Sequence, residues 1–310
     1  MRIAFMGTPD FSVECLKALV NSEHEVVGVF CQPDKPVGRK QELTPPDVKI
    51  EALKHGLDVY QPVSLRNGKG VSILETLKPD LVVVVAYGKI LPDDFLAFPK
   101  YGCINVHASV LPKYRGASPI HYAVLNGDKT TGVTVQQMDS GIDTGDILTV
   151  KECEIGINDT TEYMYEVLAP LGAEAMMETI ALIEKSELKP VKQDESKASH
   201  VGLLTKEMSR IDWSDTAFNI HNKIRGLYSW PGASTVLNGK TLKIHSSVLC
   251  EKKGNNNPGA VIESDGKIIV CCGDNNTVEL KTVQLEGKKR MDASVFLNGY
   301  PIKKGTVLGL

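Results

Sequence analysis

Residues 81–86 read Leu-Val-Val-Val-Val-Ala, an uninterrupted apolar run that is rich in β-branched side chains and only as long as a strand. Such a run is typical of a strand buried on both faces, as found in parallel sheets covered by helices on either side. The flanking sequence agrees, because short apolar runs alternate with helical patterns from residue 1 to about residue 185. This alternation predicts an α/β fold with a doubly wound, mostly parallel sheet.

The same periodicities place the individual elements of this first part. A helix should begin at Pro119, because proline is favoured in the first helical turn, and Thr160 or Thr161 should cap a long amphipathic helix. The expected strands are Ile3–Met6, Val26–Phe30, Leu81–Ala86, Cys103–His107, Thr134–Gln137 and Ile147–Val150. The expected helices are Phe11–Leu19, Val48–His55, Val71–Leu77, a short one around Phe95, Pro119–Leu125 and Thr160–Glu184.

A polar stretch, SELKPVKQDESKAS at residues 186–199, has no periodicity and contains a proline, so we interpret it as a linker. Beyond it, one more helix (Ser214–Leu227) precedes short strands joined by tight turns such as Asn238-Gly239, a strong hairpin signal. This pattern predicts a small antiparallel β-barrel, with an OB-like barrel as one option. The expected strands are Ala233–Leu237, Leu242–His245, Val261–Glu263, Lys267–Cys272 and Val278–Leu285. We expect domains at 1–188 and 206–310, with residues 189–205 between them.

Charge is divided unevenly between these two parts. The whole chain has a formal net charge of −3, which by itself argues against a nucleic-acid partner. From Lys206 to Leu310, however, 15 Lys and Arg stand against 10 Asp and Glu, a net charge of +5, which leaves −8 for residues 1–205. The second part is therefore the one suited to an anionic partner.

Several classes of protein are disfavoured by motifs that the sequence lacks. No apolar run approaches the roughly 20 residues that span a bilayer, and no signal-peptide pattern stands at the start. The seven cysteines are scattered and odd in number, without a C-x-x-C pair, so neither a disulfide framework nor a zinc ribbon is expected. We expect a cytoplasmic protein with free thiols and no metal site.

Cofactor-binding loops of the common nucleotide-dependent enzymes are missing as well. The first strand ends in Gly7-Thr8-Pro9, which has one glycine where the dinucleotide fingerprint requires three. No G-x-x-x-x-G-K-[ST] sequence occurs anywhere in the chain. NAD-dependent redox chemistry and nucleotide hydrolysis are therefore disfavoured.

Asn105 and His107 are the first candidates for chemistry. They alternate with Ile104 and Val106 at the end of a predicted strand, so both polar side chains should lie on one face. Open α/β sheets bind their ligands at the carboxyl ends of strands. An amide beside an imidazole can stabilise an oxyanion there, and the imidazole can move protons near neutral pH. A histidine at a strand end can equally be structural, and the pattern alone leaves both possibilities open.

Three further segments carry polar residues that could serve a site. The loop at 109–116 contains Tyr114 and Arg115, and it would either approach an anion, wall a pocket or lie at the surface. The sequence MDSGIDTGD at 138–146 holds three aspartates without the spacing of a calcium loop. One of them could orient His107, but spacing does not tell which. Residues 32–46, QPDKPVGRKQELTPP, lack any helix or strand pattern and are basic; such long loops are often functional, although a solvated surface loop is the alternative.

At these residues the chain resembles the 10-formyltetrahydrofolate-dependent formyltransferases. Three stretches carry the resemblance: NVHASVLPKYRGASP at 105–119, where the family shows N-x-H-x-S-x-L-P-x-x-R-G, MDSGIDTGDIL at 138–148, and VVAYGKIL at 84–91. Within the family it is most similar to the branch that acts on initiator tRNA, through MGTPDFS at 6–12, QPDKPVGRK at 32–40, IDWS at 211–214 and GKKRM at 287–291. Ala108 and Val110 stand where relatives often have Gly and Leu, two mild changes.

The resemblance implies a Rossmann-like formyltransferase domain followed by a basic, OB-like domain that helps to hold tRNA. It implies formyl transfer from 10-formyltetrahydrofolate to the α-amine of methionyl initiator tRNA, with Asn105, His107 and Asp143 as catalytic residues. The implied folate contacts are Ala86, Tyr87, Gly88, Ile90, Leu91, Ser109, Val110, Leu111, Pro112 and Asp139. The expected tRNA contacts are Lys35, Arg39, Lys40, Lys288, Lys289 and Arg290. We further expect a monomer that requires no metal and binds no membrane.

Two alternatives remain open at the level of sequence. One is another enzyme that uses the same folate, with a nucleotide sugar, a small amine or water as acceptor. The other is a noncatalytic RNA-binding protein with a vestigial α/β domain, which would bind tRNA and no folate. The basic segment 32–46 and the basic second part favour a tRNA substrate.

Overall fold

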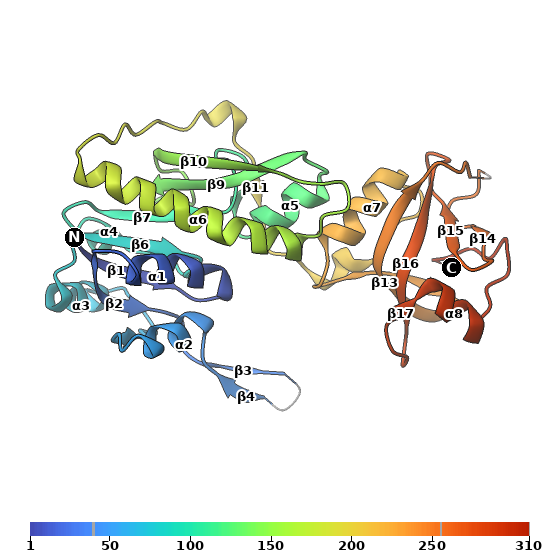
Figure 1. Ribbon diagram of the computed structural model, residues 1–310, viewed down its shortest axis with the longest axis horizontal. Helices are drawn as coiled ribbons and strands as arrows, with labels where there is room; N and C mark the ends of the chain where they lie inside the picture. Colours follow the sequence, from blue (N-terminus) through green and yellow to red (C-terminus); the bar gives the residue numbers. More distant parts are fainter. Residues whose placement is uncertain (39–40, 255, 310) are drawn as a thin grey trace. The chain divides into compact units, whose positions relative to one another are not determined.

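In the computed structural model, which describes residues 1–38, 41–254 and 256–309, the apolar run forms strand β6 (Leu81–Val85), and all five of its residues are buried. β6 pairs in parallel with β1 (Arg2–Gly7) and with β7 (Cys103–His107). The complete sheet has the order β10-β9-β7-β6-β1-β2-β5 (Figure 1). β7 pairs with β9 in antiparallel fashion, whereas β1 pairs in parallel with β2 and β2 in parallel with β5, so the predicted doubly wound, mostly parallel sheet is confirmed.

Helices cover both faces of this sheet. On one face, an apolar cluster joins Ala4, Met6 and Val84 to residues of the helices α3 and α4. On the other face, α6 crosses over β7 and β9, where Gly172 lies so close that a Cβ would be 3.1 Å from Val106 (Figure 1). The strands not yet bounded are β2 (Glu25–Phe30), β5 (Val59–Tyr60), β9 (Thr130–Gln137) and β10 (Ile147–Glu154). The helices are α1 (Val13–Val20), α2 (Asp47–Lys54), α3 (Lys69–Leu77), α4 (Asp93–Leu96) and α6 (Thr161–Glu184).

Some boundaries differ from those expected. The first helix begins with a 3-10 turn (Asp10–Ser12), and β9 and β10 extend four residues beyond the predicted strands in one direction. The long helix is capped by Thr160, whose Oγ1 accepts a hydrogen bond from the Tyr163 amide at 3.2 Å. The prediction of this cap is therefore confirmed for the first of the two threonines.

Two short strands lie within residues 32–46, which show no strand pattern in the sequence. β3 (Lys35–Val37) and β4 (Glu42–Thr44) form a two-stranded antiparallel hairpin. Each strand has three residues, and those of β4 are all exposed, Leu43 by 68%, so β4 leaves no apolar alternation in the sequence. The base of the hairpin is held by Asp34, whose carboxylate accepts hydrogen bonds from Lys49 at 2.9 Å and Gln61 at 2.7 Å.

The chain forms two compact units that interleave along the sequence. The first consists of Met1–Gly116, Thr131–Cys153 and Tyr165–Val201, and the second of Ala117–Thr130, Glu154–Met164 and Gly202–Leu310. Residues 186–199 contain a 3-10 turn (Glu195–Lys197) and stay on the first unit, because Val191 bridges to Ile147 and β11 (His200–Val201) pairs with β8 (Arg115–Gly116). The predicted boundaries at 188 and 206 stay a prediction.

The second unit is an antiparallel half-barrel with helices packed against it. Its strand order is β12-β13-β16-β15-β14, and β17 pairs with β16, so the antiparallel β domain expected from the sequence is confirmed. The strands are β12 (Ala233–Leu237), β13 (Lys240–Cys250), β14 (Val261–Glu263), β15 (Ile268–Cys271), β16 (Thr277–Leu285) and β17 (Met291–Asp292). Its helices are α5 (Pro119–Leu125), α7 (Ala217–Gly226) and α8 (Ala293–Gly299), with a 3-10 turn at Lys206–Ser209.

The cysteines are free thiols, all seven of them. Burial raises the pKa of the Cys15 and Cys103 thiols to about 12, so these sulfurs are unreactive near neutral pH. Across residues 1–38, 41–254 and 256–309, no group of three or more His, Cys, Asp or Glu side chains is arranged to hold a metal ion. No helix in that part of the chain is long and apolar enough to cross a membrane.

Candidate active site

The carboxyl end of β7 presents two polar side chains on one face. Asn105 lies opposite Val84 of β6 on one side and Gln136 of β9 on the other. Cys103, two residues before Asn105, packs in the apolar cluster under α3 and α4. Because side chains alternate along a strand, Asn105 and His107 share that face. The His107 side chain is 7% exposed.

The carboxylate of Asp143 lies close to both Asn105 and His107. Its Oδ1 lies 3.4 Å from Asn105 Nδ2 and 3.6 Å from His107 Nδ1. Gln136 Nε2 donates to the same oxygen at 2.8 Å, and the Gly116 amide donates to Oδ2 at 2.8 Å. The structure therefore brings together Asn105, His107 and Asp143, and it selects Asp143 among the three aspartates as the one that reaches the imidazole.

The hydrogen bond made by His107 Nε2 determines which ring nitrogen can exchange a proton. Nε2 lies 2.9 Å from the carbonyl oxygen of Tyr114. A carbonyl oxygen only accepts hydrogen bonds, so Nε2 must carry a proton and donate it in the neutral as well as the charged imidazole. Nδ1, the atom that faces Asp143, is therefore the position at which His107 gains or loses a proton.

Asp143 lies in a tight turn that fixes its carboxylate. Its φ is +54°, in the left-handed region that residues other than glycine seldom adopt. Asp139 shapes the same turn, because its Oδ1 accepts hydrogen bonds from the Gly141 amide at 3.0 Å and Thr144 Oγ1 at 2.7 Å. At Gly145 the backbone passes so near the Gln137 carbonyl oxygen that a Cβ would collide with it.

The loop after β7 is held by internal hydrogen bonds. Ser109 Oγ donates to the Lys113 carbonyl at 2.6 Å, and Thr134 Oγ1 donates to the Ser109 carbonyl at 2.7 Å. The Leu111 amide in turn donates to Thr134 Oγ1 at 3.0 Å. Of the folate contacts predicted here, Ser109 and Leu111 are buried, while Val110 and Pro112 are partly exposed.

A second loop leaves β6 where the sheet order reverses. The chain passes from β1 to β2 on one side and returns to β6 on the other side of β1, and such a switch point is where open α/β sheets bind ligands. Ala86, with φ of +46°, directly follows β6. Thr8 Oγ1 and Gln32 Nε2 each donate to the Tyr87 carbonyl at 3.0 Å, so this loop is tied to the ends of β1 and β2.

Within residues 86–91 the predicted folate contacts differ in exposure. Tyr87 and Leu91 are 1% and 3% exposed and belong to the apolar cluster under α3 and α4. Burial raises the pKa of the Tyr87 hydroxyl to about 12. Ala86, Gly88 and Ile90 are exposed, so these are the side chains and backbone that a ligand at the switch point would meet.

The structure corrects one possibility that the sequence left open and adds two residues. Arg115 is 1% exposed, and its guanidinium is bonded to Gln193 and Glu195, so it is not available to close over an anion. Gln136 and Gln193 contact Asp143 itself. Neither glutamine has a sequence signal, because one is a residue in an ordinary strand and the other stands in a segment without periodicity.

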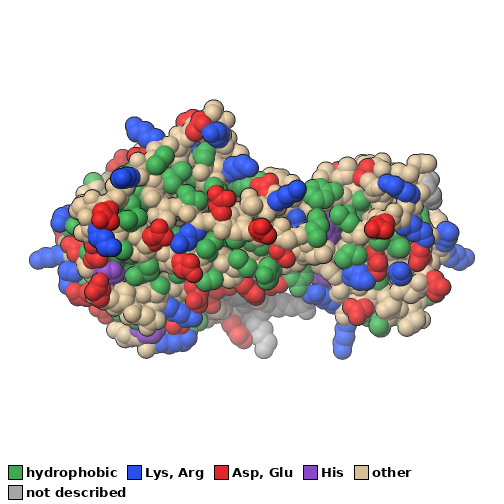
Figure 2. All heavy atoms as spheres, turned by 45° about the horizontal axis from the view of Figure 1, so that its top comes forward, with side chains coloured by type: hydrophobic (Ala, Val, Ile, Leu, Met, Phe, Trp, Pro, Cys, Tyr) green, Lys and Arg blue, Asp and Glu red, His purple; other side chains and the backbone are tan. Residues whose placement is uncertain are grey.

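The expected tRNA contacts lie mainly at the surface. Lys35, Lys288 and Lys289 are exposed, while Arg39 and Lys40 lie outside the described residues. Arg290 rests over the ring of Tyr228 at 5.4 Å and donates to its hydroxyl at 3.0 Å. On the face drawn in Figure 2, Lys and Arg side chains of the second unit lie among Asp and Glu, as its modest net charge leads one to expect.

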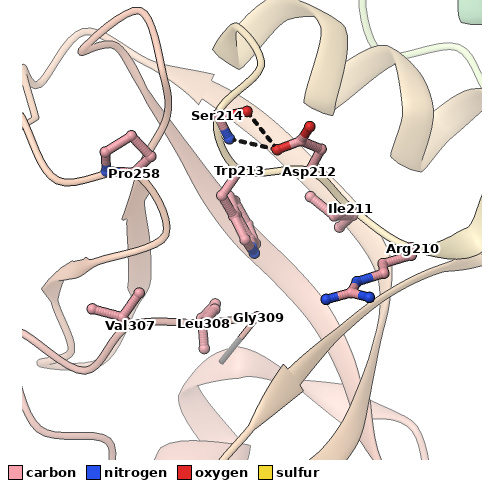
Figure 3. Close-up of a pocket in the computed structure, with 9 residues that line it drawn as sticks. All are labelled: Arg210, Ile211, Asp212, Trp213, Ser214, Pro258, Val307, Leu308 and Gly309. Atoms are coloured by element: carbon pink, nitrogen blue, oxygen red, sulfur yellow. Dashed lines mark hydrogen bonds between the residues drawn. The ribbon is translucent and has the colours of Figure 1, made fainter.

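A pocket of about 500 Å³ lies in the second unit (Figure 3), and none of the predicted catalytic residues lines it. It is lined by residues 210–214, Pro258 and residues 307–309, and so includes the IDWS stretch. Asp212 accepts hydrogen bonds from the amide and hydroxyl of Ser214, and Trp213 donates its Nε1–H to Thr235 at 2.9 Å. Because Trp213 is 5% exposed and part of the core, this stretch serves the fold of the second unit.

Comparison with known proteins identifies the family. Residues 1–180 match the Formyl transferase family and residues 203–301 match the Formyl transferase, C-terminal domain family. The chain is 45% identical over 309 residues to the methionyl-tRNA formyltransferase of Alkaliphilus oremlandii, covering 100% of both, and 45% identical over 311 residues to that of Bacillus subtilis, covering 100% of this chain and 98% of the relative.

Solved structures agree on the fold. The sugar 3N-formyl transferase WlaRD, in the presence of dTDP and 5-N-formyl-THF, superimposes with a TM-score of 0.70 at 22% identity, covering 93% of this chain and 99% of that one. The two formyl transferase domain families thus match successive parts of the chain. The relatives that match over the full length are methionyl-tRNA formyltransferases. The chain belongs to the formyl transferase family, as a member of its methionyl-tRNA formyltransferase branch.

Proposed function

We propose that this chain transfers the formyl group of 10-formyltetrahydrofolate to the α-amino group of methionine on initiator tRNA, giving N-formylmethionyl-tRNA for translation initiation. One observation carries the proposal. The similarity to methionyl-tRNA formyltransferases extends over the whole chain, and it includes a strand end at which Asn105, His107 and Asp143 meet. The proposal places the enzyme in the cytoplasm as a monomer.

The reaction makes two demands on the protein. The neutral amine attacks the formyl carbon, the carbon–nitrogen bond of the donor breaks, the amine loses one proton and the leaving nitrogen gains one. The formyl oxygen gains negative charge on the way. The Asn105 amide can donate a hydrogen bond to that oxygen from a fixed position, which is the most effective way to stabilise developing charge.

His107 and Asp143 answer the demand for proton movement. Nδ1 of His107 can accept the proton of the attacking amine, since Nε2 is committed to Tyr114. The resulting imidazolium faces the Asp143 carboxylate at 3.6 Å, which stabilises the positive charge. The same proton can then be returned to the leaving nitrogen, as general acid–base catalysis requires.

The residues proposed to hold 10-formyltetrahydrofolate, which supplies the formyl group, frame this strand end. Exposed Ala86, Gly88 and Ile90 stand at the switch point of the sheet, and Val110 and Pro112 are partly exposed on the next loop. The remaining proposed contacts act by shape rather than through free side chains: Tyr87, Leu91, Ser109 and Leu111 are buried, and Asp139 shapes the turn. Arg39, Lys40, Lys35, Lys288, Lys289 and Arg290 are the proposed tRNA contacts.

The direct test is to incubate the purified chain with 10-formyltetrahydrofolate and initiator tRNA charged with radiolabelled methionine. Formylated methionine, recovered after the ester is hydrolysed, is the expected product. A parallel reaction offers an amino sugar nucleotide as acceptor, because the fold is shared with a sugar 3N-formyl transferase. Turnover of the sugar without formylation of the tRNA would refute the proposal, whereas tRNA binding without folate binding would indicate a noncatalytic protein.

A further inference from the structure

Gln193 joins the turn that carries Asp143 to a buried arginine. Its Nε2 donates hydrogen bonds to the carbonyl oxygens of Asp143 at 2.9 Å and Gly145 at 2.7 Å. Its Oε1 accepts from Nε and Nη2 of Arg115 at 3.0 and 2.8 Å. One amide group therefore uses both of its ends, although Gln193 is 50 residues away in sequence from Asp143.

Arg115 fixes which way the amide faces. Its guanidinium also binds both carboxylate oxygens of Glu195, at 2.9 and 2.7 Å, and this hydrogen-bonded pairing raises the pKa of Arg115 above its already high value. A guanidinium only donates, so the oxygen of Gln193 must point at Arg115 and the NH2 group must point at the turn. The Arg115 amide is bound in addition to the Ser199 carbonyl at 2.8 Å.

The turn requires such a partner. Asp143 has a φ of +54°, a conformation that persists only where the surroundings hold it. Gly116 and Gln136 hold the carboxylate end of the residue. Gln193 holds the backbone end, so together they fix the position of Oδ1 relative to Asn105 and His107.

We propose that Gln193 is a positioning residue of the reaction: through the carbonyls of Asp143 and Gly145 it sets the distance between the Asp143 carboxylate and His107 Nδ1. The inference rests on the proposed function for its kinetic consequence. The competing explanation is that Gln193 only fastens residues 186–199 to the first unit. In that case its loss would lower stability and leave the turnover of folded enzyme unchanged.

Gln193→Glu separates the two explanations. The new carboxylate keeps an acceptor for Arg115, and so keeps the segment fastened, but it places an oxygen instead of an NH2 group against two carbonyl oxygens. We expect kcat to fall about 100-fold, the loss typical of a displacement of about 1 Å in a catalytic group. The KM for methionyl-tRNA should stay near that of the wild type. The melting temperature should fall, because two carbonyl oxygens lose their donor, so kcat is measured well below it, on folded enzyme.

Glu195→Gln is the matched control. It weakens the other partner of Arg115, at a side chain that is 71% exposed, and leaves the contacts of Gln193 to the turn intact. We expect kcat within about threefold of the wild type and an unaltered pH dependence of kcat, whereas Gln193→Glu should change that dependence. Equal losses of kcat in both variants would overturn the proposal, as would a Gln193→Glu enzyme that turns over like the wild type.

A second variant and a crystal structure test the positioning role even if Gln193→Glu does not fold. If Gln193→Glu does not fold, Gln193→Met preserves the volume, removes both hydrogen-bonding ends and should lower kcat about tenfold. A crystal structure of either variant measures the distance from Asp143 Oδ1 to His107 Nδ1 directly, and an unchanged distance refutes the positioning role without any assay. Failure of the wild type to formylate tRNA would instead refute the proposed function.

Discussion

Asp143 and the basic residues Lys288 and Lys289 are both proposed to serve the reaction, yet they are built in opposite ways. The Asp143 carboxylate receives hydrogen bonds from Gly116, Gln136 and Asn105, and its backbone is held by Gln193. Lys288 and Lys289 are exposed on the surface. Chemistry demands reacting groups within tenths of an ångström, whereas attraction of a phosphate backbone works over a distance and at many angles. Hydrogen-bonded fixation therefore marks the catalytic region, and exposed charge marks the binding region.

The largest effect should follow from His107→Ala. Removing the group that moves the proton should lower kcat about 1,000-fold, within the range typical of general acid–base catalysis. The affinity for initiator tRNA, measured by filter binding, should hardly change, because His107 is buried and belongs to the region of fixed geometry. Exposed His200 supplies the control: His200→Ala should keep full turnover, and parallel loss of turnover and tRNA affinity in His107→Ala would mark that residue as structural.

Thr134→Val should have the next largest effect. The Thr134 hydroxyl joins the Ser109 carbonyl to the Leu111 amide in a fully buried position, and valine leaves both groups without that partner at a cost of about 1–3 kcal/mol. The loop 109–112 should lose its shape, and the KM for 10-formyltetrahydrofolate should rise about tenfold, the factor that corresponds to about 1.4 kcal/mol.

Thr130→Val tests whether that effect is local. Thr130 stands on the same strand, β9, and its residue is exposed. Its substitution should leave the KM for the folate unchanged. If both valine variants raised KM equally, the contacts proposed for residues 109–112 would have to be abandoned.

How well the sequence predicts each region depends on whether its structure is determined by neighbouring residues or by residues far away in the chain. β7 and α5 have the predicted bounds, because a strand buried on both faces and a helix opened by Pro119 leave local signals. The common face of Asn105 and His107 follows from the two-residue period of the strand. The spacing of the aspartates did not identify Asp143, since that depends on how a turn folds back, and only the resemblance to a family pointed to it.

The sequence does not reveal the role of residues whose contacts join segments far apart in the chain. Gln193 reaches Asp143 only because residues 186–199 run back over the first unit, with Arg115 buried beneath them. Strands of two residues, such as β8 and β11, are too short to show any period. The same is true of the hairpin in residues 32–46, whose strands have three residues each.

Replacing Lys288, Lys289 and Arg290 together with glutamine should have a smaller effect, visible chiefly in the salt dependence of binding. The logarithm of the tRNA dissociation constant should depend less steeply on the logarithm of salt concentration, with a slope about 2 units smaller, because each phosphate contact contributes about 0.7–0.9. The value of kcat at saturating tRNA should not change. Lys281→Gln, at a lysine already paired with Glu279, is the control that should leave the slope nearly intact.

The smallest effect concerns His221, which tests whether burial with hydrogen bonds is enough to mark a catalytic histidine. His221 is 1% exposed, and its nitrogens contact Ser247 Oγ at 2.9 Å and the Ile157 carbonyl at 2.8 Å, neither of which is a carboxylate like that of Asp143 beside His107. Burial lowers the pKa of His221 below its ordinary value of 6.5. The unfolded chain therefore binds a proton more readily than the folded one, and stability is lost as pH falls below about 6.5. His221→Gln should have an unfolding midpoint in urea that falls less between pH 7 and pH 5 than that of the wild type, with kcat at pH 7 unaltered. A loss of turnover at pH 7 in the folded variant would break the distinction between a fixed histidine that reacts and a fixed histidine that only supports the fold.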